Sequence, residues 1–195
     1  MCLITKSKYG CISKRDMTVY KYFILDITNV PGEAKYDSRL ETPCRNVSVP
    51  CHVPFIMESS IQGRVRLSDM GLLGRKRYDC SGEGVHAYTE KNIENSFLSI
   101  SIDHNKNNHI TVQLQAECLI PKGTRIYRSA LNLDNDPFSE KIYEIAAQKM
   151  EIKKFLPVGR LPPFYNYSNF SREDLYELKR DCINPILKQI NGKGK

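Results

Sequence analysis

The sequence contains no tryptophan, and it has no apolar run near the roughly 18 residues that a membrane-spanning helix needs. Met1–Lys6 lacks the long apolar stretch and the small-residue cleavage site of a signal peptide. The seven cysteines are odd in number and do not have the dense spacing of a disulfide framework. We therefore expect a soluble, cytoplasmic protein with free thiols and no membrane partner.

The chain carries a surplus of positive charge, with 29 basic and 22 acidic residues and a formal net charge of +7. A surplus of this size is compatible with an anionic partner but does not select one. The apolar fraction of 41% is that of a globular chain. A chain of 195 residues is also long enough to bury a core without disulfides or metals.

Several segments have the apolar pattern of β-strands. Residues 17–28 are apolar, aromatic and β-branched, which predicts a strand buried on much of both faces. Residues 47–57 alternate with a period of two, but Pro50 and Pro54 restrict them to an edge strand. Residues 110–120 alternate strictly and form the clearest predicted strand. Shorter strands are expected at residues 85–88 and 125–128.

Helical patterns are fewer. Thr89 is placed to cap a helix to about residue 100, although alternating apolar residues at its end also fit a strand. Residues 141–154 fit a helix or an extended segment. Ser171 is expected to cap a C-terminal helix that is kinked near Pro185. The predicted buried stripe of that helix is Leu175, Leu178, Cys182, Ile183 and Ile186.

Together these patterns predict an α+β fold, with a strand-rich mixed or antiparallel sheet and two or three helices. Residues 1–154 would form the core domain. Residues 155–170 are rich in proline and tyrosine, and we expect an extended arm there. The arm and the last helix, residues 155–195, would pack on the core.

Four segments together resemble a known family: Met1–Ile4, Met17–Lys21, Gly82–Tyr88 and Glu117–Tyr127. In this order they resemble a family of uncharacterised small proteins of gut Bacteroidetes and their phages. The resemblance covers residues 1–145. It departs at Asp136–Ile142, where the family tends to have Gly-Tyr-Ala-Ser and this chain keeps only the serine. The family has no assigned chemistry, so the resemblance implies a phage or mobile-element origin and no mechanism.

Cys2 is the first of two enzymatic hypotheses. Removal of Met1 would leave a cysteine whose own α-amine can act as its base, as in N-terminal-nucleophile hydrolases. The amidotransferase pattern continues with Gly-Ile, whereas Leu3-Ile4 follows here. A small second residue is also common for other reasons, so a Cys2 hydrolase is only an alternative.

The second enzymatic hypothesis is a layout similar to that of ADP-ribosyltransferases, which use NAD. Tyr20-Lys21, the pair His86 and Tyr88, and Glu140 would occupy the positions of its cofactor-contacting and catalytic residues. The usual Arg or His-Gly start is missing, and Tyr20 and Tyr88 also fit as ordinary strand aromatics. With both enzyme patterns incomplete, the sequence favours a non-enzymatic protein.

Metal binding is a further hypothesis, for Cys44, Cys51, His52, Cys80 and His86. No two of these cysteines have the Cys-x₂₋₄-Cys spacing of a structural zinc site. Cys51 also belongs to the apolar set of its predicted strand. We therefore expect neither a metal nor a cofactor.

Basic residues near a glycine-containing loop are the remaining candidates, namely Arg64, Arg66, Arg75, Lys76, Arg77 and His86. They would bind an anionic small molecule such as a nucleotide, or nucleic acid, with Tyr165, Tyr167 and Phe170 available to stack on bases. A solvated face is the ordinary alternative. The sequence thus favours a non-enzymatic phage accessory protein that binds a host protein or an anionic small ligand, with an anti-defence role.

Overall fold

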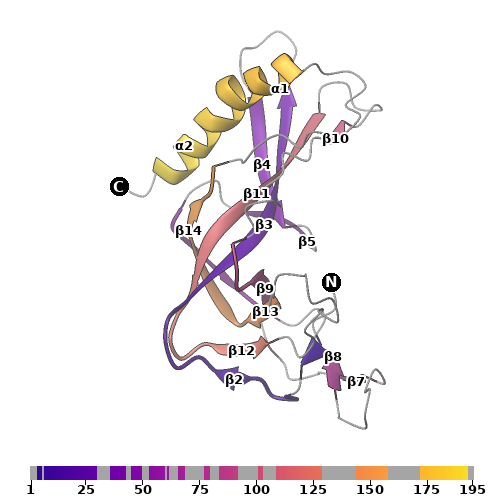
Figure 1. Cartoon of the computed structure of the whole chain (residues 1–195), viewed down its shortest axis with the longest axis vertical. Coiled ribbons are helices and arrows are strands. Elements are labelled where there is room, and N and C mark those ends of the chain that lie inside the picture. The colour runs from indigo at the N-terminus through magenta and orange to yellow at the C-terminus, as the bar shows by residue number, and fades with distance from the viewer. Residues whose placement is uncertain are drawn as a thin grey trace. The chain divides into compact units, whose positions relative to one another are not determined.

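β-Strands dominate the described part of the chain, and helix occurs there only near the C-terminal end (Figure 1). The structure, a computed structural model, describes residues 4–5, 7–29, 36–42, 45–49, 53–59, 61, 66–68, 77–79, 84–91, 101–102, 109–128, 144–157 and 172–192. The chain forms two compact units. Unit 1 comprises Met1–Lys21, Ile56–Lys91 and Glu117–Lys153, and unit 2 comprises Tyr22–Phe55, Asn92–Ala116 and Lys154–Lys195.

The strands range from two to 13 residues in length. They are β1 (Ile4–Thr5), β2 (Cys11–Ile12), β3 (Met17–Asn29), β4 (Tyr36–Thr42), β5 (Arg45–Val49), β6 (Phe55–Glu58), β7 (Arg66–Ser68), β8 (Arg77–Asp79), β9 (Val85–Tyr88), β10 (Ser101–Ile102), β11 (His109–Ile120), β12 (Arg125–Arg128), β13 (Glu144–Ala147) and β14 (Lys149–Phe155). The C-terminal helix consists of α1 (Arg172–Leu178), a π-helical turn η2 (Lys179–Ile183) and α2 (Asn184–Gly192).

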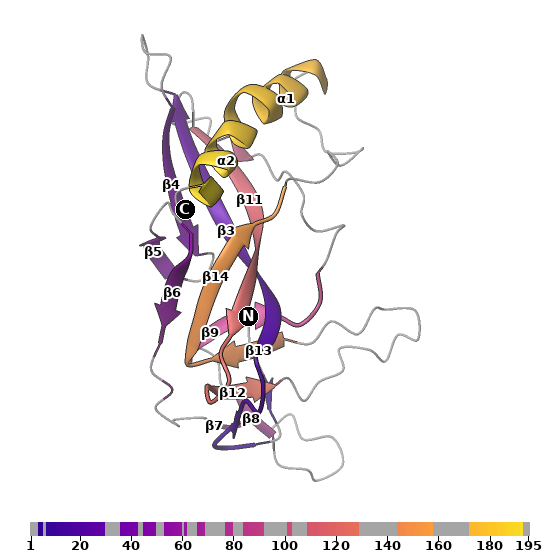
Figure 2. The same ribbon diagram turned by 90° about the vertical axis from the view of Figure 1, so that its left-hand side faces the viewer.

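Every strand pairing whose register is described is antiparallel. The larger sheet has the order β2-β12-β13-β9-β3-β11-β14-β6, with β4 paired to β3, β5 to β4 and β10 to β11. A smaller sheet has the order β1-β8-β7. Within unit 1, β9, β13 and β12 lie next to one another (Figure 2).

The alternation predicted for residues 110–120 is confirmed in β11. Val112, Leu114, Ala116, Cys118 and Ile120 are all buried. Successive side chains of a strand point to opposite faces, so this period of two places the apolar set on one side. The strand predicted at residues 17–28 is likewise present as β3.

The core of unit 1 is formed by three consecutive strands, β12, β13 and β14, together with β9 from an earlier part of the chain. Its buried side chains include Val85, Ala87, Ile126, Tyr127, Ile145, Ala146, Ala147, Met150 and Ile152. Ile145 pairs with Ala87 across β13 and β9, and Ala147 pairs with Ile126 across β13 and β12. Strand β13 therefore joins two neighbouring strands through its buried residues.

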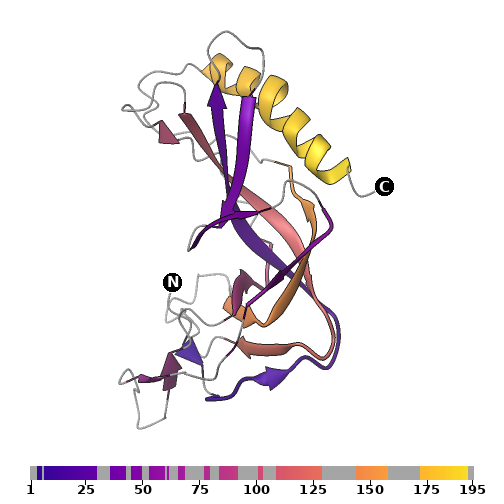
Figure 3. The same cartoon turned by 180° about the vertical axis from the view of Figure 1, so that it is seen from behind.

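In unit 2, the C-terminal helix buries apolar side chains and is hydrogen-bonded to the end of β14. Cys182, Ile183, Leu187 and Ile190 of the helix are buried. Asn191 holds the backbone of Phe155 at both its N–H and its carbonyl, at 2.8 and 2.9 Å. Phe155 itself meets the ring of Phe23 edge-on, with centroids 5.2 Å apart. The path of this helix can be followed in Figure 3.

The structure corrects two expectations about secondary structure. Residues 144–147 and 149–155 are strands β13 and β14, so the extended alternative holds for this region and the helical one is wrong. The described residues accordingly contain a single helical segment rather than two or three helices. The expected edge strand at residues 47–57 is divided between β5 and β6. Ser101–Ile102 is a strand, and residues 92–100 lie outside the described part.

The predicted C-terminal helix is confirmed, and it begins at Arg172. The predicted cap, Ser171, lies outside the described residues, as do residues 158–170 of the expected arm. A π-helical turn ends directly before Asn184 and Pro185. Pro185 has no N–H to donate to the carbonyl four residues earlier, and the helix widens at this point. The predicted domain boundary at residue 154 stays a prediction.

No helix in the described part of the chain combines the length and the apolar character needed to cross a membrane.

Candidate anion-binding surface

Two segments of unit 1 that lie far apart in the sequence are joined into one surface. Strand β2 pairs with β12, so that Ile12 lies opposite Arg125. Ser13 continues the connection: its N–H donates to the carbonyl of Thr124 at 2.8 Å, and its own carbonyl accepts from the N–H of Gly123 at 2.9 Å. We call the exposed side chains of residues 8–16 and 121–125 the basic edge.

The basic edge holds a large part of the surplus charge of the chain. Its five basic residues less one acidic residue, Asp16, leave +4, against +7 for the whole chain. All five basic side chains are exposed: Lys8, Lys14, Arg15, Lys122 and Arg125. Arg128 is not counted. It follows Arg125 by three residues in the same strand, so its side chain points to the opposite face, and its guanidinium lies 3.7 Å from the sulfur of Met17.

These five cations have no carboxylate partner among the described residues. Within the described residues, none of them forms an ion pair at 4.0 Å or less. Asp16 instead accepts a hydrogen bond from the backbone N–H of Lys122 at 2.7 Å. Unpaired cations keep their full attraction for an anionic partner, whereas paired ones must first give up a bond.

An exposed aromatic residue, Tyr9, lies beside two of these charges. Tyr9 is 64% exposed, and Ile12 is 52% exposed. The ammonium group of Lys8 lies 5.5 Å from the ring centroid of Tyr9, within the range of a cation–π contact. The guanidinium of Arg125 donates to the carbonyl of Tyr9 at 3.1 Å. Apolar and cationic groups are therefore presented together.

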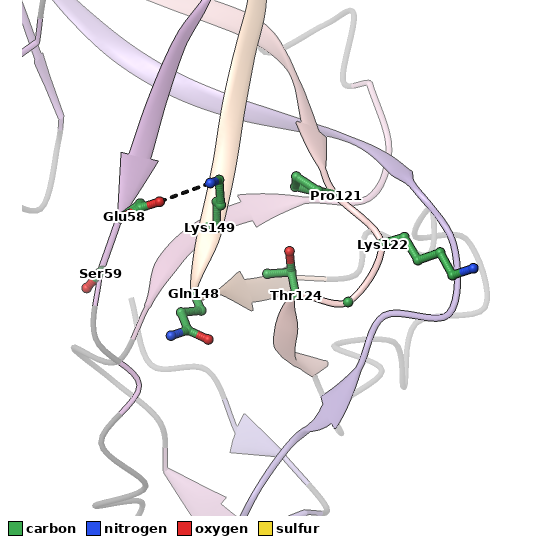
Figure 4. A pocket seen from close by; sticks show the side chains of 8 residues that line it. Glu58, Ser59, Pro121, Lys122, Thr124, Gln148 and Lys149 are labelled. Atoms are coloured by element: carbon green, nitrogen blue, oxygen red, sulfur yellow. Dashed lines mark ion pairs between the residues drawn. The ribbon is translucent and has the colours of Figure 1, made fainter.

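A cavity of about 680 Å³ adjoins this surface at the turn between β11 and β12 (Figure 4). This volume lies within the roughly 300–1,000 Å³ of small-molecule sites. The polar side chains that line it are Glu58, Ser59, Lys122, Thr124, Gln148 and Lys149. Lys149 is paired with Glu58 at 3.1 Å, and the side chain of Lys122, which also belongs to the basic edge, extends away from the other lining side chains (Figure 4).

The backbone of the turn does not offer a phosphate-binding nest. The N–H of Lys122 donates to Asp16, and that of Gly123 donates to Ser13. The N–H of Thr124 donates to the carbonyl of Pro121 at 3.2 Å. Because these donors are engaged, an anion at the cavity would depend on side chains.

His86 takes part in a different arrangement, inside the sheet of unit 1. Its Nδ1 lies 2.8 Å from Oε1 of Glu144, and both side chains are largely enclosed, at 16% and 12% exposure. Lys21, which is buried, donates to the carbonyl of His86 at 2.9 Å. The Nε2 of His86 is buried and has no hydrogen-bond partner in the part of the chain that the structure describes. The negative partner of His86 makes it a poor anion ligand.

The predicted enzymatic residues are only partly described. Tyr88 lies directly opposite Tyr20 in the β9–β3 pairing, so the structure brings these two predicted positions together with Lys21 and His86. Cys2 and Glu140 lie outside the described residues.

The predicted arginine cluster is likewise incomplete. Arg66 lies in β7 opposite Asp79, and Arg77 lies in β8 opposite Ser68. Arg64, Arg75 and Lys76 lie outside the described residues, as do Cys44, Cys51, His52 and Cys80 of the zinc hypothesis. Among the residues that are described, no three histidine, cysteine or acidic side chains gather as a metal site would require.

Comparisons with models of protein families, with curated proteins and with solved structures found no match for this chain. The basic edge therefore rests on geometry alone. Sequence reasoning did not identify it, although the basic residues Lys14, Arg15 and Lys122 are apparent in the sequence. The signal that was missing is the strand pairing that brings them together.

Proposed function

We propose that this protein is a non-enzymatic binding protein that holds an anionic partner at its basic edge. The observation that carries the proposal is the group of five exposed cations without ion pairs among the described residues, fixed on two segments by main-chain hydrogen bonds. A surface of this kind concentrates an oppositely charged partner and speeds its association. The adjoining cavity, which includes Lys122 in its lining, would admit part of that partner.

The state of His86 supports binding rather than catalysis. One ring nitrogen faces Glu144, and the other is buried away from solvent. A general base has to come within hydrogen-bond reach of its substrate, so the Nε2 of His86 would first have to be uncovered. The favourable observation for an NAD-using enzyme is the placement of Tyr20 opposite Tyr88. That alternative predicts release of nicotinamide from NAD by the purified protein.

The biological setting of the proposal comes from the sequence resemblance. An accessory protein of phage or mobile-element origin would use an anion-binding surface against the host, for example to hold a signalling nucleotide or to mask an acidic host protein. Cytoplasmic location and an anti-defence role are parts of this proposal.

Charge reversal on the basic edge tests the binding function. The variant Lys14→Glu/Arg15→Glu removes two of its exposed cations, and Lys91→Glu/Lys188→Glu changes the net charge equally at exposed lysines elsewhere. The probe is inorganic polyphosphate, measured by titration calorimetry at several salt concentrations. Because each lost phosphate contact lowers the salt dependence as well as the affinity, we expect the first variant to bind at least about tenfold more weakly with a shallower salt slope.

The control variant should keep most of its affinity. Equal weakening in both variants would show that net charge, and not the basic edge, governs binding. Failure of the unmodified protein to bind polyphosphate would overturn the proposal directly.

A further inference from the structure

Tyr9 is the most exposed of the large hydrophobic side chains that the structure describes, at 64%. The backbone beneath it is held firmly: Arg125 donates to the carbonyl of Tyr9, and the hydroxyl of Tyr127 donates to the carbonyl of Lys8, both at 3.1 Å. On the other side, the hydroxyl of Ser7 donates to the carbonyl of Gly10 at 3.1 Å. The ring is thus presented on an ordered support and not on a free loop.

An ordered and exposed ring is suited to bind a flat partner. Little conformational entropy is lost when a group that is already fixed makes a contact. A tyrosine ring has two faces that can stack on a planar group, and here the ammonium of Lys8 lies 5.5 Å from its centroid. Ile12, 52% exposed on the neighbouring strand, adds apolar surface.

The charges around the ring fit a phosphate backbone. Proteins that bind single strands without sequence preference combine a cationic track for the backbone with aromatic side chains on which bases stack. The basic edge supplies both: Lys8 and Arg125 lie beside Tyr9, and its remaining cations have no ion pair among the described residues. A duplex hides the faces of its bases, and an acidic peptide offers carboxylates without flat rings, so neither would use Tyr9 in this way.

We therefore propose that the anionic partner is a single-stranded nucleic acid, with a base stacked on Tyr9 and its phosphates on the cations of the basic edge. The inference rests on the proposed anion-binding function and names its ligand class. Binding would be sensitive to salt and tolerant of sequence, because stacking is available to every base.

The test compares three ligands of similar charge by fluorescence competition: a single-stranded oligothymidylate, an abasic oligonucleotide of equal length, and inorganic polyphosphate. The variants are Tyr9→Ala and Tyr9→Phe, with Tyr176→Ala as control, since Tyr176 is 50% exposed on α1 in unit 2. We expect Tyr9→Ala to weaken oligothymidylate binding by roughly 5- to 150-fold, the range for loss of one stacked base. Tyr9→Phe and Tyr176→Ala should bind it as the unmodified protein does.

Binding of the abasic oligonucleotide and of polyphosphate should change less than about twofold in all three variants, because neither ligand has a base to stack; unchanged binding also verifies that each variant is folded. If polyphosphate binds at the basic edge but oligothymidylate binds no better than the abasic ligand, the nucleic-acid inference is wrong and anion binding stands. The same conclusion follows if Tyr9→Ala has no effect, or if polyglutamate, added as a fourth ligand, competes as well as oligothymidylate. If no ligand binds, the proposed function itself fails.

Discussion

Replacement of Gly10 by alanine tests whether residues 8–12 lie against β12 as the structure has them. Gly10 has a φ of +67°, and a Cβ at this position would collide with the carbonyl oxygen of Ile126. It would also lie 3.2 Å from Cδ1 of Tyr127. Gly123 has a similar φ of +85°, but a Cβ there would meet nothing within 4 Å. An alanine at Gly123 therefore measures the free-energy cost of the left-handed backbone conformation alone. An alanine at Gly10 measures that cost together with the cost of the steric clash.

The expected magnitudes follow from this difference. A side chain in the left-handed region costs about 1–2 kcal/mol, and we expect Gly123→Ala to lose this amount from its free energy of unfolding. Gly10→Ala bears the same cost. It must also displace the backbone of β12, and overpacking of this kind adds about 1–3 kcal/mol. The total for Gly10→Ala is therefore about 2–5 kcal/mol.

Urea unfolding followed by circular dichroism measures both variants against the unmodified protein. We also expect Gly10→Ala to weaken polyphosphate binding, because relief of the clash moves Lys8 and Tyr9 away from Arg125. If Gly10→Ala proved as stable as Gly123→Ala, the approach of Gly10 to Ile126 would be wrong. The basic edge would then lose its structural foundation.

Three further predictions concern buried groups and can be measured by the same unfolding assay. Gln115 is 1% exposed, and neither polar atom of its side chain has a partner among the described residues. Gln115→Met should therefore raise the free energy of unfolding by about 1–3 kcal/mol. A lower free energy of unfolding would show that Gln115 has a polar partner. Glu144→Ala should lower the free energy of unfolding by about 1–3 kcal/mol, because His86 loses its acceptor. Glu144→Gln should lower it by less. Equal losses in the two variants would contradict the role of Glu144 as the partner of His86. Burial raises the pKa of Cys118 from 9.0 to about 12, so the unfolded chain releases this proton first. Stability should therefore fall between pH 9 and 12 by up to about 1.4 kcal/mol per pH unit, and a Cys118→Ala variant with an unchanged slope would refute the assignment.

The sequence predicted those elements whose pattern fits one kind of structure only. Residues 110–120 alternate without interruption, and a period of two is incompatible with one buried helix face, so β11 followed from the pattern. Residues 141–154 have apolar positions that suit either period. Their state is decided by the pairing of β13 with β12 and with β9, and β9 lies in a much earlier part of the chain. A local pattern cannot contain that information.

The same distinction explains why the basic edge was not predicted. Residues 64–77 contain five arginines and lysines, more than the three of residues 8–16 or the two of residues 121–125. Charge density in space depends instead on which segments pair and on which cations face carboxylates. Lys149 faces Glu58 and Lys153 faces Glu151, whereas Lys14 and Lys122 have no such partner in the described ranges. A pairing across more than 100 residues, Ile12 with Arg125, therefore decides where an anion would bind.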